Sequence, residues 1–85
     1  MSKYTELLID AAGWAGVLAL LLAYWLVSAR RVRGSDAAYQ LLNAVGGLLL
    51  MLNSFYHGAL PSAFVNVVWV GIAVWALAAA RARRD

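Results

Sequence analysis

The sequence predicts an all-α fold, a bundle of three transmembrane helices that forms a single domain over residues 1–85. Three mostly apolar runs cover nearly the whole chain: Leu7 to Val27, Tyr39 to Tyr56 and Pro61 to Ala80. Each run holds about 18 to 21 residues, enough helix to cross a hydrocarbon layer about 30 Å thick. The composition agrees, because 65% hydrophobic and 13% charged residues leave too little polar surface for a soluble domain of this size.

The first run is predicted to remain in the protein as a span and not to be cleaved as a signal peptide. It is longer than the apolar region of a signal peptide, carries Asp10 early, and is followed by arginines instead of a small-residue cleavage site. At 100° per residue its small side chains share one narrow stripe, which predicts a helix-packing face made of Ala12, Gly16, Ala19 and Ala23.

The second run gathers its polar and small residues within about a third of its circumference. Uncompensated burial of an amide in apolar surroundings costs about 1 to 3 kcal/mol, so this side is expected to face protein or water. Ser35 and Asp36 precede the run and are predicted to cap its positive end. The residues on the polar side are Asn43, Gly46, Gly47, Leu50, Asn53, Ser54 and His57.

The third run begins at Pro61, where a proline in the first turn loses no helical hydrogen bond. Trp69 stands near the middle of this run, away from the interfaces where tryptophan usually anchors a span. It either fills space or, with Asn66 one turn away, offers a flat surface beside an amide that suits small polar solutes such as sugars. Asn53 and Asn66 are expected either to hydrogen bond between helices or to line a pocket, and Asn43 to pack helices together.

The arginines predict the orientation in the membrane. They form two patches that each follow an apolar run, and the short second loop has none. Basic residues are retained on the cytoplasmic side, which places the N-terminus outside and the C-terminus inside, in the inner membrane of a bacterium. Topology therefore explains the net charge of +3 better than nucleic-acid binding does. The two patches are Arg30, Arg31 and Arg33, and Arg81, Arg83 and Arg84.

No pattern of catalytic or metal-binding residues is present, so we expect neither an enzyme nor a cofactor or metal site. The chain has no cysteine and a single histidine, His57. His57 is expected at the membrane surface in contact with water, the alternative being a proton carrier or ligand. The four carboxylates, Glu6, Asp10, Asp36 and Asp85, are not paired at catalytic spacing.

Short segments of the sequence resemble two known groups of membrane proteins. The Gly13-Trp14 pair, Leu60-Pro61 and the following Asn66-Val67-Val68 resemble the SemiSWEET group of the PQ-loop (MtN3-like) superfamily, whose members are three-helix half-transporters that pair into homodimers and pass small sugars. The resemblance implies that Asn66 lies in a central sugar pocket. The Pro-Gln pair of that group aligns with Leu26 and Val27 here, and the position of its pocket tryptophan aligns near Asn53.

The segments Tyr39 to Asn43 and Asn53 to Ser62 are also similar to small bacterial three-span proteins that are sometimes labelled permease-like.

Two functions remain open at this stage. In the first, the chain is a homodimeric, SemiSWEET-like facilitator or binder of a small solute, with Asn53, Asn66 and Trp69 as the substrate-binding residues. In the second, it is a non-catalytic accessory subunit packed against a larger bacterial respiratory or photosynthetic complex. Both functions place the chain in the lipid bilayer, and neither function involves nucleic acid as a partner.

Overall fold

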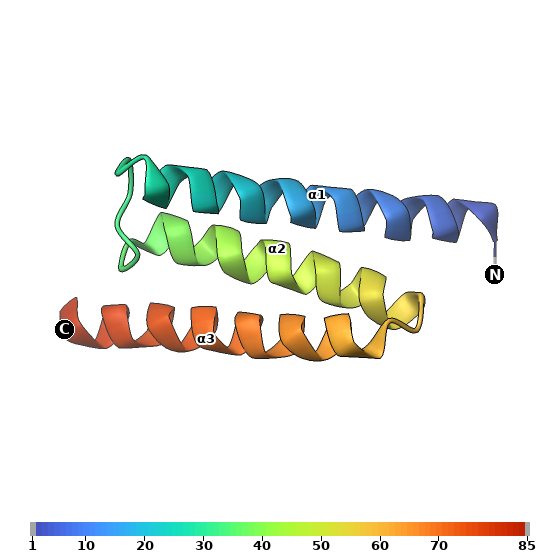
Figure 1. Cartoon of the computed structure of the whole chain (residues 1–85). Helices are drawn as coiled ribbons and strands as arrows, with labels where there is room; N and C mark the ends of the chain where they lie inside the picture. The colour runs from blue at the N-terminus through green and yellow to red at the C-terminus, as the bar shows by residue number, and fades with distance from the viewer. Residues whose placement is uncertain (1, 85) are drawn as a thin grey trace.

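The computed structural model describes the backbone of residues 2–84 and the side chains of residues 2–82, and it consists of three helices (Figure 1). They are α1 (Lys3–Ser28), α2 (Ala37–Tyr56) and α3 (Leu60–Arg84). Each is long and apolar enough to cross a membrane. The predicted all-α fold with three potential spans is confirmed, and α1 and α3 extend beyond the predicted apolar runs.

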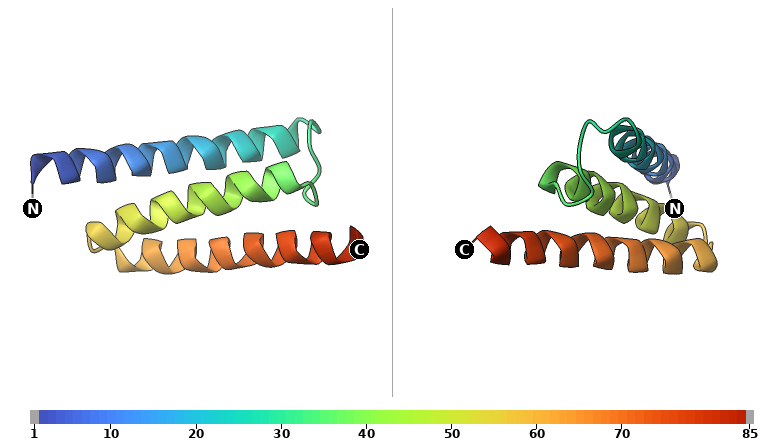
Figure 2. Two further views of the ribbon diagram at one scale, coloured as in Figure 1. Left: turned by 180° about the vertical axis from the view of Figure 1, so that it is seen from behind. Right: turned by 60° about the vertical axis from the view of Figure 1, so that its left-hand side comes forward.

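The helices form an open layer with α2 in the middle, and successive helices run antiparallel (Figure 2). Helix α2 packs against α1 on one side and against α3 on another, whereas no Cα atoms of α1 and α3 lie within 8 Å of each other in the described part of the chain. The layer measures 46 × 24 × 20 Å. It therefore differs from a closed bundle, in which every helix contacts both others, and each outer helix depends on α2 for its place.

Two adjacent glycines allow α2 to pack closely on both sides. A Cβ atom built on Gly46 would lie 3.0 Å from the Gly16 carbonyl oxygen of α1, and one built on Gly16 would lie 2.7 Å from the Gly46 carbonyl oxygen. A Cβ on Gly47 would lie 2.9 Å from the Val70 Cγ2 of α3. Neighbouring helical residues point about 100° apart, so Gly46 faces one outer helix and Gly47 the other.

The connections end the helices with the same local structure. Arg30 at φ 59° and Gly58 at φ 71° are left-handed residues just past α1 and α2. The Arg31 N–H donates to the Leu26 carbonyl, and the Ala59 N–H donates to the Ser54 carbonyl at 2.8 Å, which is the Schellman pattern. Glycine adopts this conformation without steric strain, so Gly58 suits the tight turn into α3.

The predicted capping of α2 is found only in part. Asp36 occupies the N-cap position, but its side chain makes no capping bond to the helix. Its Oδ2 atom accepts a hydrogen bond from the backbone N–H of Arg33 at 2.9 Å instead. The carboxylate therefore stabilises the turn before α2 and leaves the first N–H groups of the helix without this partner.

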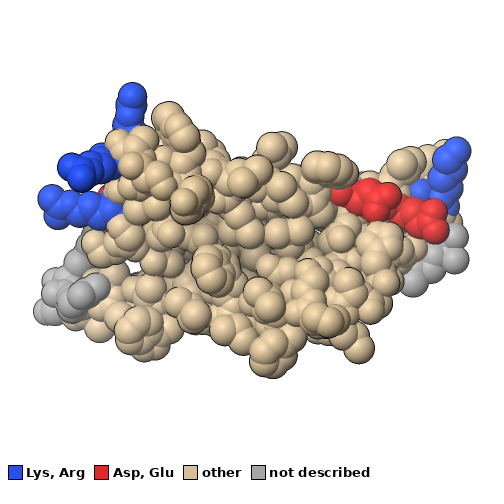
Figure 3. Space-filling view, in the orientation of Figure 1, with Lys and Arg blue, Asp and Glu red and all other residues tan. Residues whose placement is uncertain are grey.

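The described charged side chains gather at the two ends of the layer (Figure 3). Lys3, Glu6 and Asp10 lie on α1 near its start, and the described arginines lie at the opposite end, in the α1–α2 connection and on α3: Arg30, Arg31, Arg33 and Arg81. The long apolar sides between the ends fit the hydrocarbon of a bilayer.

Alanine at Gly16 should destabilise the fold, because the new methyl group meets the backbone of α2, which cannot move aside. We expect the free energy of unfolding in mixed detergent–SDS micelles to fall by about 1 to 3 kcal/mol. Gly71→Ala is the matched control, since a Cβ there meets nothing within 4 Å. An equal loss of stability in both variants would contradict the close crossing of α1 and α2.

Candidate functional site

The polar side of α2 divides into two columns that face different helices. Asn53 and His57 hydrogen bond to α1, in line with Gly46 and Leu50. Asn43 and Ser54 hydrogen bond to α3, in line with Gly47. The single polar stripe of α2 thus serves two separate helix contacts, one at each side of the layer.

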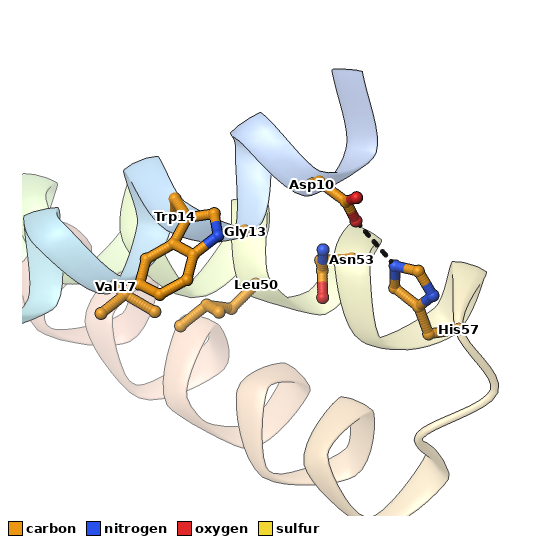
Figure 4. A pocket seen from close by; sticks show the side chains of 7 residues that line it. All are labelled: Asp10, Gly13, Trp14, Val17, Leu50, Asn53 and His57. Carbon is orange, nitrogen blue, oxygen red and sulfur yellow. Dashed lines mark hydrogen bonds and ion pairs between the residues drawn. The ribbon is translucent and has the colours of Figure 1, made fainter. Parts of the chain in front are cut away.

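An open pocket of about 270 Å³ lies between α1 and α2 at the end of the layer where α1 begins (Figure 4). It brings a carboxylate, an imidazole, an amide and an indole together beside apolar side chains. We call this hollow the α1–α2 pocket. It is lined by Asp10, Gly13, Trp14, Val17, Leu50, Asn53 and His57.

Two hydrogen bonds across the helices define the polar half of this pocket. The Asn53 Nδ2 donates to the backbone carbonyl of Ile9 at 2.9 Å. The His57 Nε2 lies 3.0 Å from the Asp10 Oδ1, and both side chains are about half exposed, at 47% and 55%. A Cβ on Gly13 would lie 2.5 Å from the Asn53 Nδ2, so glycine is required for the amide to reach the α1 backbone.

The opposite side of α2 holds α3 through a tryptophan. The Trp69 Nε1 donates to the Asn43 Oδ1 at 3.1 Å, and the Asn43 Nδ2 donates to the Tyr39 carbonyl at 3.0 Å. Asn43 is 7% exposed, whereas Trp69 is 47% exposed. A shallow hollow of about 180 Å³ runs beside this pair, lined by Tyr39, Gln40, Asn43, Trp69, Ile72 and Ala73.

Ser54, Ser62 and Asn66 form a second polar contact between α2 and α3. The Ser54 and Ser62 hydroxyls lie 2.9 Å apart, and the Asn66 Nδ2 donates to the Ser62 carbonyl at 3.0 Å. Asn66 is 9% exposed. In the part of the chain that the structure describes, no buried side-chain nitrogen or oxygen lacks a hydrogen-bond partner. These residues pack helices in the geometry seen here.

The structure does not bring the three predicted substrate-binding residues together within one chain. Asn53 faces α1 and lines the α1–α2 pocket, whereas Trp69 and Asn66 lie at the α2–α3 contact. Of the predicted packing residues, Gly16, Ala23, Asn43, Gly46, Gly47 and Ser54 are buried, and Ala12 and Ala19 are half-buried.

Six of the seven residues that line the α1–α2 pocket were not predicted to bind a substrate, among them Asp10 and Trp14. Asp10 and His57 lie at the ends of α1 and α2 that are remote from the connection between them. Folding these two runs as an antiparallel hairpin brings those ends together, so the pairing was open to inference from the register of the hairpin. Neither run by itself shows this register, so the pairing of Asp10 with His57 was not predicted.

A third hollow, of about 630 Å³, lies at the arginine-rich end, between the start of α2 and the end of α3. It is lined by Ser35, Asp36, Ala37, Ala38, Leu77, Ala80 and Arg81. Among the described residues no group of three His, Cys, Asp or Glu side chains stands close enough to hold a metal ion.

Comparison with known proteins assigns the chain to a protein family. Residues 9–84 match the model of an uncharacterised protein family, and the chain belongs to this family. No curated protein and no solved structure matches the chain. The resemblance to the SemiSWEET group stays a prediction.

The Trp69–Asn43 hydrogen bond should appear as a coupling in a double-mutant cycle. For Trp69→Phe combined with Asn43→Ala we expect about 0.6 kcal/mol, and less than about 1.7 kcal/mol, in the free energy of unfolding in mixed micelles. Trp75→Phe with Asn43→Ala is the control cycle, because Trp75 is 70% exposed. Its coupling should stay within about 0.5 kcal/mol of zero. Equal coupling in both cycles would contradict the bond.

Proposed function

We propose that this member of the family is an integral membrane protein that binds a small polar solute, or facilitates its passage, as a homodimer. Its binding site is the α1–α2 pocket. The proposal places the N-terminus outside and the C-terminus in the cytoplasm of a bacterium, with the protein in the inner membrane and the pocket near the outer surface. Catalysis is not part of the proposal.

The composition of the α1–α2 pocket is the observation that supports this function. Ligand sites usually combine apolar walls with a few convergent polar groups. Here Trp14, Val17 and Leu50 supply the walls, and Asp10 and Asn53 supply polar atoms at one edge (Figure 4). A volume of about 270 Å³ suits a solute of few heavy atoms.

A homodimer is proposed because the chain forms an open layer. Three helices in a row enclose no path across a membrane, and α1 and α3 each have only α2 as a neighbour in the described part of the chain. Two copies related by a two-fold axis would present the same surface to each other. A pair of layers would then have room for a solute between them, as the SemiSWEET resemblance implies.

Solute binding and flux in reconstituted vesicles test this function. Wild-type vesicles should bind or accumulate at least one member of a panel of radiolabelled sugars, polyols and small amines. Trp14→Ala should reduce the binding or uptake of that solute by about two- to fivefold, the loss expected when an exposed aromatic face is removed. Trp75→Ala is the matched control, because both indoles are 70% exposed and only Trp14 lines the pocket.

Two outcomes count against the proposed function. One is a set of vesicles that neither bind nor pass any member of the panel. The other is an equal effect of Trp14→Ala and Trp75→Ala, which would place binding elsewhere.

An accessory-subunit function is the second candidate, and the same open layer favours it. Helices of a foreign subunit could pack beside α1 or α3, since each has a single neighbour in the described structure. Chemical cross-linking in native membranes should then recover one larger membrane protein in a fixed ratio to this chain. Recovery of self-linked chains alone would exclude this candidate and support the homodimer.

A further inference from the structure

In the polar part of the α1–α2 pocket, open positions for accepted hydrogen bonds outnumber the donors that the described residues leave without an acceptor. Asp10 uses Oδ1 to contact His57, and Asn53 uses Nδ2 to contact Ile9. Within the described residues this leaves the Asp10 Oδ2 and the Asn53 Oδ1 without a donor, and both atoms only accept. The remaining donors are the Trp14 Nε1–H and the second N–H of the Asn53 Nδ2, which have no acceptor among the described residues. Each of the two oxygens can accept two hydrogen bonds, so positions for accepted bonds outnumber these donors.

The imidazole adds no donor on the pocket side. A carboxylate only accepts, so the His57 Nε2 carries the hydrogen that is shared with Asp10. The second ring nitrogen of His57 is turned away from Asn53 (Figure 4). A ligand that matches these surroundings must therefore bring donors, and a sugar, whose hydroxyls both donate and accept, would find few partners for its oxygens.

The electrostatics favour a positive ligand. Asp10 places a carboxylate in the pocket, and Glu6 adds a second carboxylate one turn away on α1. Lys3 lies a further turn toward the start of α1 and is the one cationic side chain described at this end. Asn53 belongs to the last turn of α2, whose C-terminal dipole also favours cations.

Trp14 supplies a surface that suits such a cation. Its indole stands beside Val17 and above Leu50 at the apolar edge of the pocket (Figure 4). A cation over an exposed aromatic face gains a modest electrostatic attraction. The pocket thus joins an aromatic wall, a carboxylate oxygen and an amide oxygen in a volume of about 270 Å³.

We propose that the α1–α2 pocket binds a small primary ammonium ion. The Asp10 Oδ2 and the Asn53 Oδ1 accept hydrogen bonds from its N–H groups, and Trp14 covers the carbon atoms next to the nitrogen, which share its positive charge. This inference rests on the proposed function and narrows its solute class. The same ammonium group occurs on free small amines and on the ethanolamine headgroup of membrane lipids, and the pocket's place at one end of the helices allows access to both.

Saturation binding of radiolabelled ethanolamine to the full chain in phosphatidylcholine nanodiscs tests this proposal. Choline should compete at least about tenfold more weakly, since its quaternary nitrogen has no N–H for the carboxylate to accept. Asp10→Asn should weaken ethanolamine binding by about tenfold or more, while its amide oxygen can still accept from His57. Glu6→Gln is the matched control and should weaken binding by less than about twofold, because it removes the same charge from a residue that does not line the pocket.

A second arm separates the two sources of the ammonium group. If the lipid headgroup is the ligand, phosphatidylethanolamine in the nanodiscs should block ethanolamine binding, and wild-type protein should retain more of this lipid on purification than Asp10→Asn does. If a free amine is the ligand, the added lipid should have no effect. Either result supports an ammonium site.

The remaining outcomes distinguish this inference from the proposed function. Saturable binding of glycerol or glucose, with no preference for ethanolamine over choline, would overturn the ammonium site and leave the solute-binding function standing. No saturable binding of any of these ligands, with no retained phosphatidylethanolamine, would overturn both. Equal loss in Asp10→Asn and Glu6→Gln would show a general charge effect and overturn the ammonium site alone.

Discussion

The adjacent glycines of α2 are the constraint on which the rest of this structure depends. Gly46 allows the α1 backbone to approach until a carbonyl oxygen of α1 lies where a side chain would otherwise be. Gly47 likewise leaves space for the Val70 side chain of α3. In a membrane, association of helices relies on such close packing and on hydrogen bonds, because lipid is as apolar as the side chains. Helix α2, with a glycine facing each neighbouring helix, therefore holds the layer together.

The close approach also positions the polar groups. Because α1 lies against Gly46, the Asn53 amide reaches a backbone carbonyl of α1 and the His57 ring reaches Asp10. Packing of α3 against Gly47 brings the Trp69 indole within 3.1 Å of the Asn43 amide oxygen. Polar atoms in the interior of the layer are paired, whereas those at the α1–α2 pocket are paired only in part. This difference separates packing residues from candidate ligand groups.

The sequence was sufficient to predict the three spans, but it did not predict that they form an open layer. Apolar run length determines a membrane helix, so all three helices were predictable. The polar stripe of α2 was also visible, but hydropathy does not say that Gly46 and Gly47 face different partners, so Asn53 was grouped with Asn66 and Trp69. Asp10 appeared as an isolated carboxylate, because its partner His57 is distant in sequence and meets it only once the register of the α1–α2 hairpin is known.

Disulfide cross-linking tests the layer with α2 at its centre most directly, since the chain has no cysteine of its own. Ser54→Cys with Ser62→Cys should close within a single chain, because the two hydroxyls lie 2.9 Å apart. Ala12→Cys with Ala63→Cys should stay open in the same chain, because no Cα atoms of α1 and α3 lie within 8 Å in the described structure. An α1–α3 disulfide that forms within one chain as readily as the α2–α3 disulfide would contradict this account.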